Sequence, residues 1–272
     1  MGLEAVRLSP DLGVELRGFD PRDLNPAAAD AFRQAFLDHH LVLLRGVDLS
    51  DEDQTALTET LGPISFVSPV MKKGGARKFS FVSNQHADGE LRDGELFFHS
   101  DHTFFEHPLK AISLFSLAAP TVGGETAFAN AGAAYARLPD RLKARIADLS
   151  ARHVASYGAF HGDKRPVFDP ESKAKVAIKP MVWRHPQTGA PILFVSRLLT
   201  ESVIGLPRAE SEALLEELFA YIEDPAHIYL HAWREGDYLV WDNRQLQHAR
   251  RDFDPSQKRA LRRVPIAETV AG

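Results

Sequence analysis

Short apolar or alternating segments, each closed by turn residues, recur along most of this chain and limit the folds open to it. Leu41-Val42-Leu43-Leu44, for example, is a continuous apolar run ended by Arg45-Gly46. Such segments predict two strands within 3–19 and further strands at 41–44, 79–83, 111–118, 151–157, 176–183, 192–195, 226–232, 237–242 and 259–266. Helical spacing of apolar residues predicts helices at 26–39, around 138–146 and at 207–223. Ser50 followed by Asp53 can form a capping box for a further helix, which runs to Leu61 and stops at Gly62-Pro63.

This order of elements favours a mainly β protein with inserted α-helices, built on an antiparallel β-sandwich or jelly roll. A dinucleotide-binding fold is disfavoured, because no G-x-G-x-x-G follows the first strand and strands and helices do not alternate regularly. The 272 residues contain no repeat or Gly/Ser-rich linker, so we expect one domain over 1–272.

Composition narrows the class of protein further. The net charge of −5 gives no global attraction to nucleic acid or membrane surfaces. The chain has no cysteine, which excludes disulfides and thiolate ligands and fits a reducing compartment. No signal peptide and no membrane-spanning run is visible. We therefore expect a cytoplasmic protein that acts on a small molecule, with no nucleic-acid or membrane partner and with a homo-oligomer as an open possibility.

A candidate metal site begins in the aromatic run from Phe97 to Phe105. His99 and Asp101 are two residues apart, so on an extended strand both side chains point to one face. The phenylalanines around them indicate burial, and a buried carboxylate is costly unless it is paired or bound to a metal. His102 and His107 compete as ligands, but His102 falls on the opposite strand face and His107 lies at a Glu-His-Pro turn. We prefer His99 with Asp101.

A second histidine completes a ligand set. His248 follows a short loop after the strand 237–241, where the rim of a barrel is expected. Two histidines and one carboxylate form the facial triad of non-haem Fe(II) oxygenases, which leaves coordination positions open.

A basic segment, Lys258 to Arg263, gives a third signal. On a strand, Arg259 and Arg263 share a face with Leu261, while Arg262 points the other way. Two inward arginines require anions, and a guanidinium is well shaped to bind a carboxylate. A basic surface patch is the alternative, which the acidic overall balance weakens.

Taken in order, the motifs resemble those of the TauD/TfdA family, named after taurine and 2,4-dichlorophenoxyacetate dioxygenases. The similarity extends from about Val42 to Pro265 and is carried by His99-Ser100-Asp101, Gly123-Gly124-Glu125-Thr126, Trp241-Asp242-Asn243, His248 and Arg259 to Arg263. The resemblance implies a double-stranded β-helix, a jelly-roll (cupin-like) variant, and an Fe(II)- and 2-oxoglutarate-dependent dioxygenase. It implies that His99, Asp101 and His248 ligate Fe(II), that Thr126 and Arg259 bind the distal carboxylate of 2-oxoglutarate, and that Arg263 binds an anionic group of the substrate.

The implied reaction consumes O2 and 2-oxoglutarate, releases succinate and CO2, and hydroxylates a small anionic substrate, such as an amino-acid derivative or organic acid. Desaturation or oxidative bond cleavage by the same chemistry, a non-enzymatic jelly-roll binding protein and a zinc hydrolase are the alternatives. Further candidate substrate contacts are His86, Tyr157 and His161, in loops that could cover the site, and Arg197, which follows the strand 192–195 and could reach the mouth of the barrel. A surface position without a role at the site is the alternative for Arg197.

Overall fold

The larger of the two main sheets has seven strands in the order β1-β2-β3-β14-β6-β16-β4. The computed structural model describes residues 2–66, 71, 75, 77–155, 171 and 173–269. Neighbouring strands of this sheet are antiparallel except for the parallel pair β2 and β3. The strands are β1 (Glu4–Arg7), β2 (Val14–Arg17), β3 (Leu41–Leu44), β4 (Ser80–Ser83), β6 (Ala111–Ala118), β14 (Tyr238–Asp242) and β16 (Ala260–Ile266).

A smaller antiparallel sheet faces the larger one, with the order β13-β7-β15-β5. Its strands are β5 (Leu96–His99), β7 (Thr126–Asn130), β13 (Ile228–His231) and β15 (Leu246–Arg250). Phe128 of the smaller sheet packs edge-on against Trp241 of the larger one, with ring centroids 5.3 Å apart. Apolar side chains from both sheets fill the space between them, among them Leu41, Leu43, Ile112, Leu114, Leu239, Leu246 and Leu261. The predicted mainly β fold with a jelly-roll core is confirmed.

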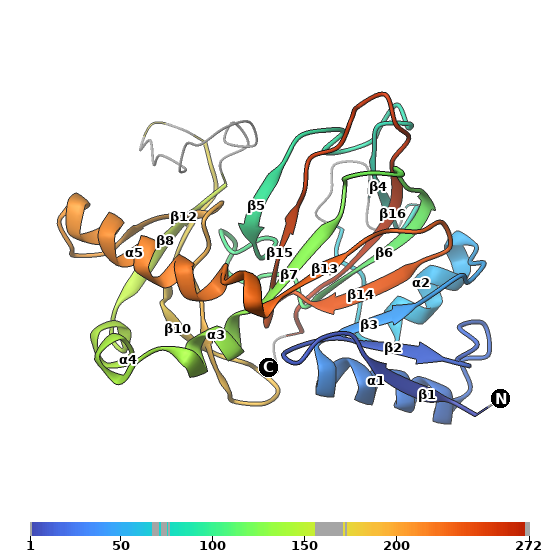
Figure 1. Ribbon diagram of the computed structural model, residues 1–272, viewed down its shortest axis with the longest axis horizontal. Helices are drawn as coiled ribbons and strands as arrows, with labels where there is room; N and C mark the ends of the chain where they lie inside the picture. Colours follow the sequence, from blue (N-terminus) through green and yellow to red (C-terminus); the bar gives the residue numbers. More distant parts are fainter. Residues whose placement is uncertain are drawn as a thin grey trace.

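Two helices cover the outer face of the larger sheet, α1 (Pro26–His39) and α2 (Asp51–Glu59) (Figure 1). The Asn25 side chain caps α1 by accepting from the Ala28 N–H. Ser50 and Asp53 form the predicted capping box at the start of α2. Phe32, Phe36 and Leu57 pack from these helices against the sheet, so its outer face is a second core.

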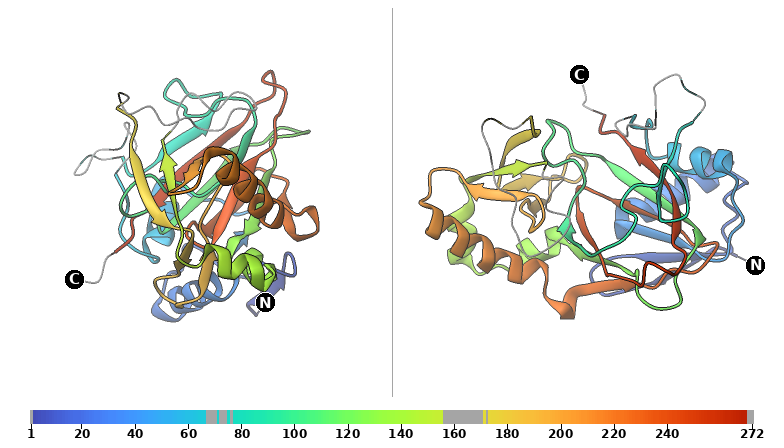
Figure 2. Two further views of the ribbon diagram at one scale, coloured as in Figure 1. Left: turned by 90° about the vertical axis from the view of Figure 1, so that its left-hand side faces the viewer. Right: turned by 90° about the horizontal axis from the view of Figure 1, so that it is seen from above.

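A separate layer lies beside the two-sheet body and carries the remaining helices (Figure 2). It contains α3 (Ala131–Arg137), α4 (Asp140–Ile146), α5 (Arg208–Ile222), the 3-10 turn η1 (Pro225–His227) and strands β8 (Ser150–Val154), β9 (Val176–Pro180), β10 (Val182–Arg184), β11 (Pro191–Leu193) and β12 (Thr200–Val203). The apolar stripe predicted on α5 is buried among them: Leu214, Leu215, Leu218, Phe219 and Ile222. No helix in the described part of the chain is long and apolar enough to cross a bilayer.

His248 follows the short loop after β14, as expected, and lies within strand β15, because pairing with β5 and β7 makes Leu246–Arg250 a central strand. One prediction of local structure is wrong: Asp101 does not continue the strand of His99, because β5 ends at His99 and Asp101 begins a turn. Helix α3 was not predicted; its small residues give no apolar stripe, but the Asn130 side chain caps it by accepting from the Ala133 N–H.

Candidate metal and anion site

Strand pairing places the two histidines of the candidate site side by side. His248 on β15 lies opposite His99 on β5, and the two ring centroids are 4.2 Å apart. On its other side His248 lies opposite Phe128 of β7, whose ring is part of the interior core. Since residues paired in antiparallel strands share a face, both imidazoles project into the space between the two sheets.

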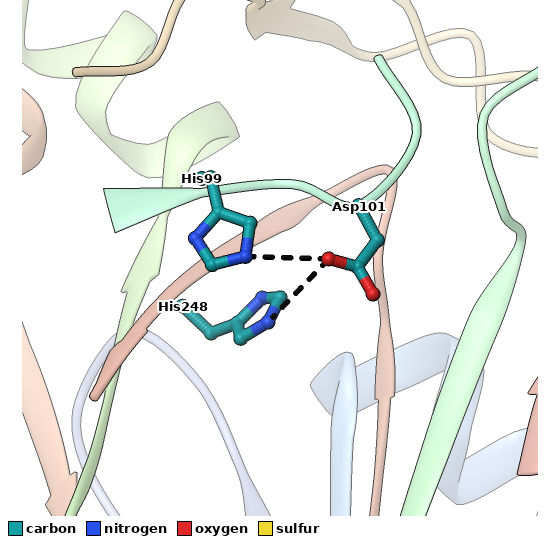
Figure 3. A group of neighbouring side chains, drawn as sticks. All are labelled: His99, Asp101 and His248. Carbon is teal, nitrogen blue, oxygen red and sulfur yellow. Dashed lines mark ion pairs between the residues drawn. The ribbon is translucent and has the colours of Figure 1, made fainter. Parts of the chain in front are cut away.

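Asp101 closes the group from the turn that follows β5 (Figure 3). Its Oδ1 lies 3.2 Å from Nε2 of His99 and 3.9 Å from Nε2 of His248. One ligand atom from each residue lies within 4.8 Å of the others, the only such group of three found among the described residues. Two imidazole nitrogens and one carboxylate oxygen are therefore directed at a common point.

The protonation of these groups fits a divalent metal. His99 Nδ1 lies 2.8 Å from the Phe97 carbonyl oxygen, so Nδ1–H donates to it and Nε2 is left as the ligand atom. Burial lowers the pKa of His248 to about 3, and His99 adds to this effect, so the His248 ring is neutral at physiological pH. Neutral imidazole is the form that binds a metal. A mixed nitrogen and oxygen donor set of this kind suits Fe(II).

Asp101 is held in place from two sides. Arg263 donates from Nη2 to Asp101 Oδ2 at 2.6 Å, which leaves Oδ1 for a metal. Burial by itself would raise the pKa of Asp101, but the charge of Arg263 and the contact with His99 outweigh it and hold that pKa well below its usual value. The carboxylate is therefore ionised throughout the physiological range.

Asn243 fixes the backbone of this ligand. Its Oδ1 accepts from the Asp101 N–H at 2.7 Å, and its Nδ2 donates to the carbonyl oxygens of Asp101 and Leu109, both at 3.0 Å. The Asn243 side chain is fully buried, so no water competes for these bonds. Asp101 lies in a turn, so no strand pairing orients its backbone. The hydrogen bonds of the Asn243 side chain do so instead.

We expect Asn243→Ala to weaken metal affinity about 10- to 100-fold, the range typical of groups that orient metal ligands. Asn243→Asp keeps the acceptor for the Asp101 N–H but loses the two donated bonds, so an intermediate loss is expected. Titration with Fe(II) under anaerobic conditions gives the dissociation constants. Asn25→Ala is the matched control: it removes the α1 cap and should cost about 1 kcal/mol of stability while leaving metal affinity unchanged.

The space between the two sheets that holds the metal ligands also contains a buried cation, Arg259, at one end. The Arg259 side chain is 3% exposed, and no carboxylate oxygen of a described residue lies within 4.0 Å of it. Its Nε donates to the Gly124 carbonyl oxygen at 3.3 Å. Burial, with the charge of Arg250, lowers the pKa of Arg259 to about 9. A buried guanidinium of this kind marks a site for an anion.

Thr126 and Gly124 shape the surroundings of that cation. Thr126 Oγ1 accepts from Trp233 Nε1–H at 2.9 Å, so its own hydroxyl proton is free to donate to an anion. Gly124 has a φ of +71°, and a Cβ there would lie 2.8 Å from Pro120 and 3.3 Å from Nε of Arg259. Glycine is therefore required for both the backbone conformation and the close approach of Arg259.

The other candidate residues are dispersed. Arg262 points to the opposite face of β16, as expected, where its Nε donates to Gln54 Oε1 at 2.7 Å. His86 stacks on Phe81, which pairs with Arg262 and so lies on the outer face of the larger sheet, away from the metal ligands. Arg197 forms ion pairs of 2.9 Å with Glu223 and 3.0 Å with Glu216. Tyr157 and His161 lie outside the described residues.

Sequence reasoning missed Asn243, which orients Asp101, and Arg250, whose charge acts on Arg259. Asn243 belongs to a motif that carried the family resemblance, but its role depends on which backbone it contacts. Arg250 alternates with His248 and would have been found had 246–250 been predicted as a strand.

A jelly roll that directs two histidines and one carboxylate at a single point defines the class of non-haem iron oxygenases. The model of the family described as "Taurine catabolism dioxygenase TauD, TfdA family" matches residues 4–264, and the chain belongs to this family. The predicted enzyme class, a 2-oxoglutarate-dependent dioxygenase, is confirmed.

Individual relatives agree with this assignment. The chain is 31% identical to the (S)-phenoxypropionate/alpha-ketoglutarate-dioxygenase of Sphingobium herbicidovorans, over 96% of this chain and 93% of the relative. It is 30% identical to the alpha-ketoglutarate-dependent sulfate ester dioxygenase of Pseudomonas putida, over 95% and 87%. The crystal structure of AAD-2 in complex with Mn(II) and N-oxalylglycine superposes with a TM-score of 0.82 at 28% identity, covering 99% of both chains.

Proposed function

We propose that this protein uses Fe(II) and 2-oxoglutarate to hydroxylate a small organic anion. The observation that carries the proposal is the group His99, Asp101 and His248 within the same interior as Arg259, a buried guanidinium with no acidic partner among the described residues. Iron with 2-oxoglutarate supplies activation of O2, with succinate and CO2 as by-products and an oxidised substrate as product.

Different residues of the chain would bind the metal and the cosubstrate. His99, Asp101 and His248 would hold the metal, and Arg259 with the Thr126 hydroxyl would bind the distal carboxylate of 2-oxoglutarate. The apolar core residues Phe128 and Trp241, which lie against His248, would exclude water from this space. Nearby charges then act at a lower effective dielectric constant than in water.

Arg263 is the residue we propose to bind the anionic group of the substrate. Its guanidinium lies beside the metal ligands, where it donates to Asp101 Oδ2, and the Arg263 side chain is only 10% exposed. One curated relative acts on phenoxypropionate and another on sulfate esters, and both substrates carry an anionic group. We therefore propose a substrate with a carboxylate or sulfate group and an aliphatic C–H bond within a few bonds of it. Desaturation and bond cleavage remain the alternative outcomes.

Anaerobic addition of Fe(II) and then 2-oxoglutarate tests the proposal. A visible charge-transfer band should appear, and admission of O2 with a panel of aryloxyalkanoates and alkyl sulfates should release succinate in step with product. A zinc hydrolase would give neither signal, and a binding protein would give no succinate. Absence of both the band and succinate across the panel would contradict the proposed function.

Replacement of Arg259 should act on the cosubstrate alone. We expect Arg259→Ala to raise the dissociation constant of 2-oxoglutarate about 10- to 100-fold, since a charged hydrogen-bonded contact contributes about 1.5–3 kcal/mol. Arg259→Lys keeps the charge but loses the planar pair of donors, so a smaller loss is expected. Titration of the Fe(II)-loaded protein with 2-oxoglutarate measures both, and Fe(II) affinity should stay unchanged.

Several predictions stay predictions. They are a single domain over 1–272, a cytoplasmic location, the absence of nucleic-acid and membrane partners, a possible homo-oligomer, and substrate contacts by Tyr157 and His161. For Arg197 and His86 we propose no substrate contact, because the Arg197 guanidinium is occupied by Glu216 and Glu223 and the His86 ring stacks on the outer face of the sheet.

A further inference from the structure

Arg250 occupies a place on β15 that neither the metal nor the substrate assignment uses. It follows His248 by two residues and lies opposite Thr126 of β7. Residues two apart on a strand share a face, and so do cross-strand partners. The Arg250 side chain therefore starts beside Thr126, on the face that holds the metal ligands.

The guanidinium of Arg250 is enclosed by a turn of backbone. It donates from Nε to the Gly94 carbonyl oxygen at 2.9 Å, from Nη1 to the Leu91 carbonyl oxygen at 2.5 Å, and from Nη2 to the Asp93 carbonyl oxygen. Leu91 and Gly94 both have positive φ, of 48° and 80°, which turns the segment around the guanidinium. This segment leads directly into β5, which carries His99.

These contacts satisfy hydrogen bonds without neutralising the charge. Carbonyl oxygens are dipoles and not ions, and no carboxylate oxygen of a described residue lies within 4.0 Å of the Arg250 guanidinium. Asp93 and Asp252 interact with it only at longer range. Arg250 is 4% exposed, and burial lowers its pKa to about 10, so it still carries its charge at neutral pH.

Arg250 and Arg259 form a pair of like charges. Their guanidinium carbons lie 6.0 Å and 5.8 Å from the centroid of the Phe253 ring, and the charge of Arg250 acts on Arg259. Two buried cations repel each other, and an anion placed near both relieves the repulsion. A dianion places its second negative charge near the two arginines and is stabilised by both. A monoanion whose only charge lies at the metal gains little from them.

We propose that Arg250 is a specificity-determining residue for the cosubstrate, favouring 2-oxo dicarboxylic acids over 2-oxo monocarboxylic acids through its charge, while its carbonyl contacts fix the segment Leu91–Gly94. In this proposal Arg259 contacts the distal carboxylate of the cosubstrate directly, and Arg250 attracts that carboxylate through its charge without touching it. The inference rests on the proposed use of 2-oxoglutarate and goes beyond it in explaining how the longer acid is selected.

The experiment compares the affinities of 2-oxoglutarate and 2-oxobutyrate, which lacks the distal carboxylate, for anaerobic Fe(II)-loaded protein. Arg250→Gln keeps an amide donor for the segment but removes the charge, so 2-oxoglutarate affinity should fall roughly tenfold while 2-oxobutyrate affinity changes less than about twofold. Arg250→Lys keeps the charge and should hold 2-oxoglutarate affinity within about threefold of wild type. Amide hydrogen exchange of residues 91–94 should accelerate in Arg250→Lys, since one ammonium cannot replace three guanidinium contacts.

Arg251→Gln is the matched control, because it removes the same charge one residue away on an exposed side chain, and it should leave both affinities unchanged. Equal weakening of both acids by Arg250→Gln, or no change in either, would overturn the inference. Should that variant fail to fold, a loss of 2-oxoglutarate affinity above about tenfold in folded Arg250→Lys would overturn it equally. A wild-type protein that binds neither acid contradicts the proposed function itself, and the Arg250 role with it.

Discussion

Asp101→Ala is expected to abolish metal binding and turnover together. The variant removes one of three ligands and leaves Arg263, now without its 2.6 Å partner, as a cation beside the metal position. Repulsion between that guanidinium and a divalent ion adds to the loss of the ligand. The expected fall in metal affinity is at least ~10³-fold, or about 4 kcal/mol, which exceeds the 10- to 100-fold effect of residues that only orient ligands.

Metal content after dialysis and succinate release measure this prediction. His99→Ala should behave in the same way, because its Nε2 is the atom left free by the bond from Nδ1 to Phe97. Asp148→Asn, an exposed carboxylate on the surface, is the control and should bind metal as wild type does. Asp101→Asn tests the charge with little change of shape. Either Asp101 variant retaining one tightly bound metal per chain, with wild-type turnover, would contradict the assignment.

Asp242→Asn is expected to destabilise the fold by about 3–5 kcal/mol at neutral pH, the cost of breaking a buried ion pair from one side. Asp242 Oδ2 accepts from Arg244 Nη2 at 2.7 Å and from His185 Nε2 at 2.9 Å. Its Oδ1 accepts from the backbone N–H and from Nε of Arg244 at 3.0 Å and 2.9 Å. All three residues are at most 1% exposed, so the substitution leaves the buried Arg244 with Glu268 as its remaining acidic partner.

The destabilisation caused by Asp242→Asn should depend on pH in a defined direction. Burial acts to raise the pKa of Asp242, but the hydrogen bonds from Arg244 and His185 outweigh it and lower that pKa below its usual value. A depressed pKa in the folded state gives stability that is present above the unfolded value, about 3.9, and is lost as pH falls below it. The stability difference between wild type and Asp242→Asn should therefore be largest near neutral pH and shrink below about pH 4.

Urea unfolding at several pH values measures the difference. Arg208→Gln, which breaks the exposed ion pair with Glu212 on α5, is the control and should cost less than about 1 kcal/mol. A difference between wild type and Asp242→Asn that is below 1 kcal/mol at pH 7, or that grows in acid, would contradict the role assigned to this carboxylate. Asp242→Asn should also weaken metal binding modestly, because Asp242 anchors the turn that carries Asn243.

Local structure could be predicted from the sequence wherever contacts between residues close in the chain determine it. Helix α1 occupies the predicted residues, and Ser50 with Asp53 forms the predicted capping box, since both depend on contacts within four residues. The opposite faces of Arg259 and Arg262 follow from the two-residue period of a strand. Strand β3 followed from a continuous apolar run, which is typical of a strand buried on both faces.

Tertiary structure alone decided how the site is assembled. The choice of His248 over other histidines depends on the register of β15 against β5, a pairing across about 150 residues that local pattern does not encode. Asn243 reaches Asp101 across a similar interval. Arg197 pairs with Glu216 of α5 and with Glu223 at the C-cap of that helix, and no motif links these glutamates to it. The residue types and spacing thus determined which chemistry this chain can perform. The long-range strand pairing determined where that chemistry is placed, because register and burial are properties of the whole packed sheet and not of any one segment.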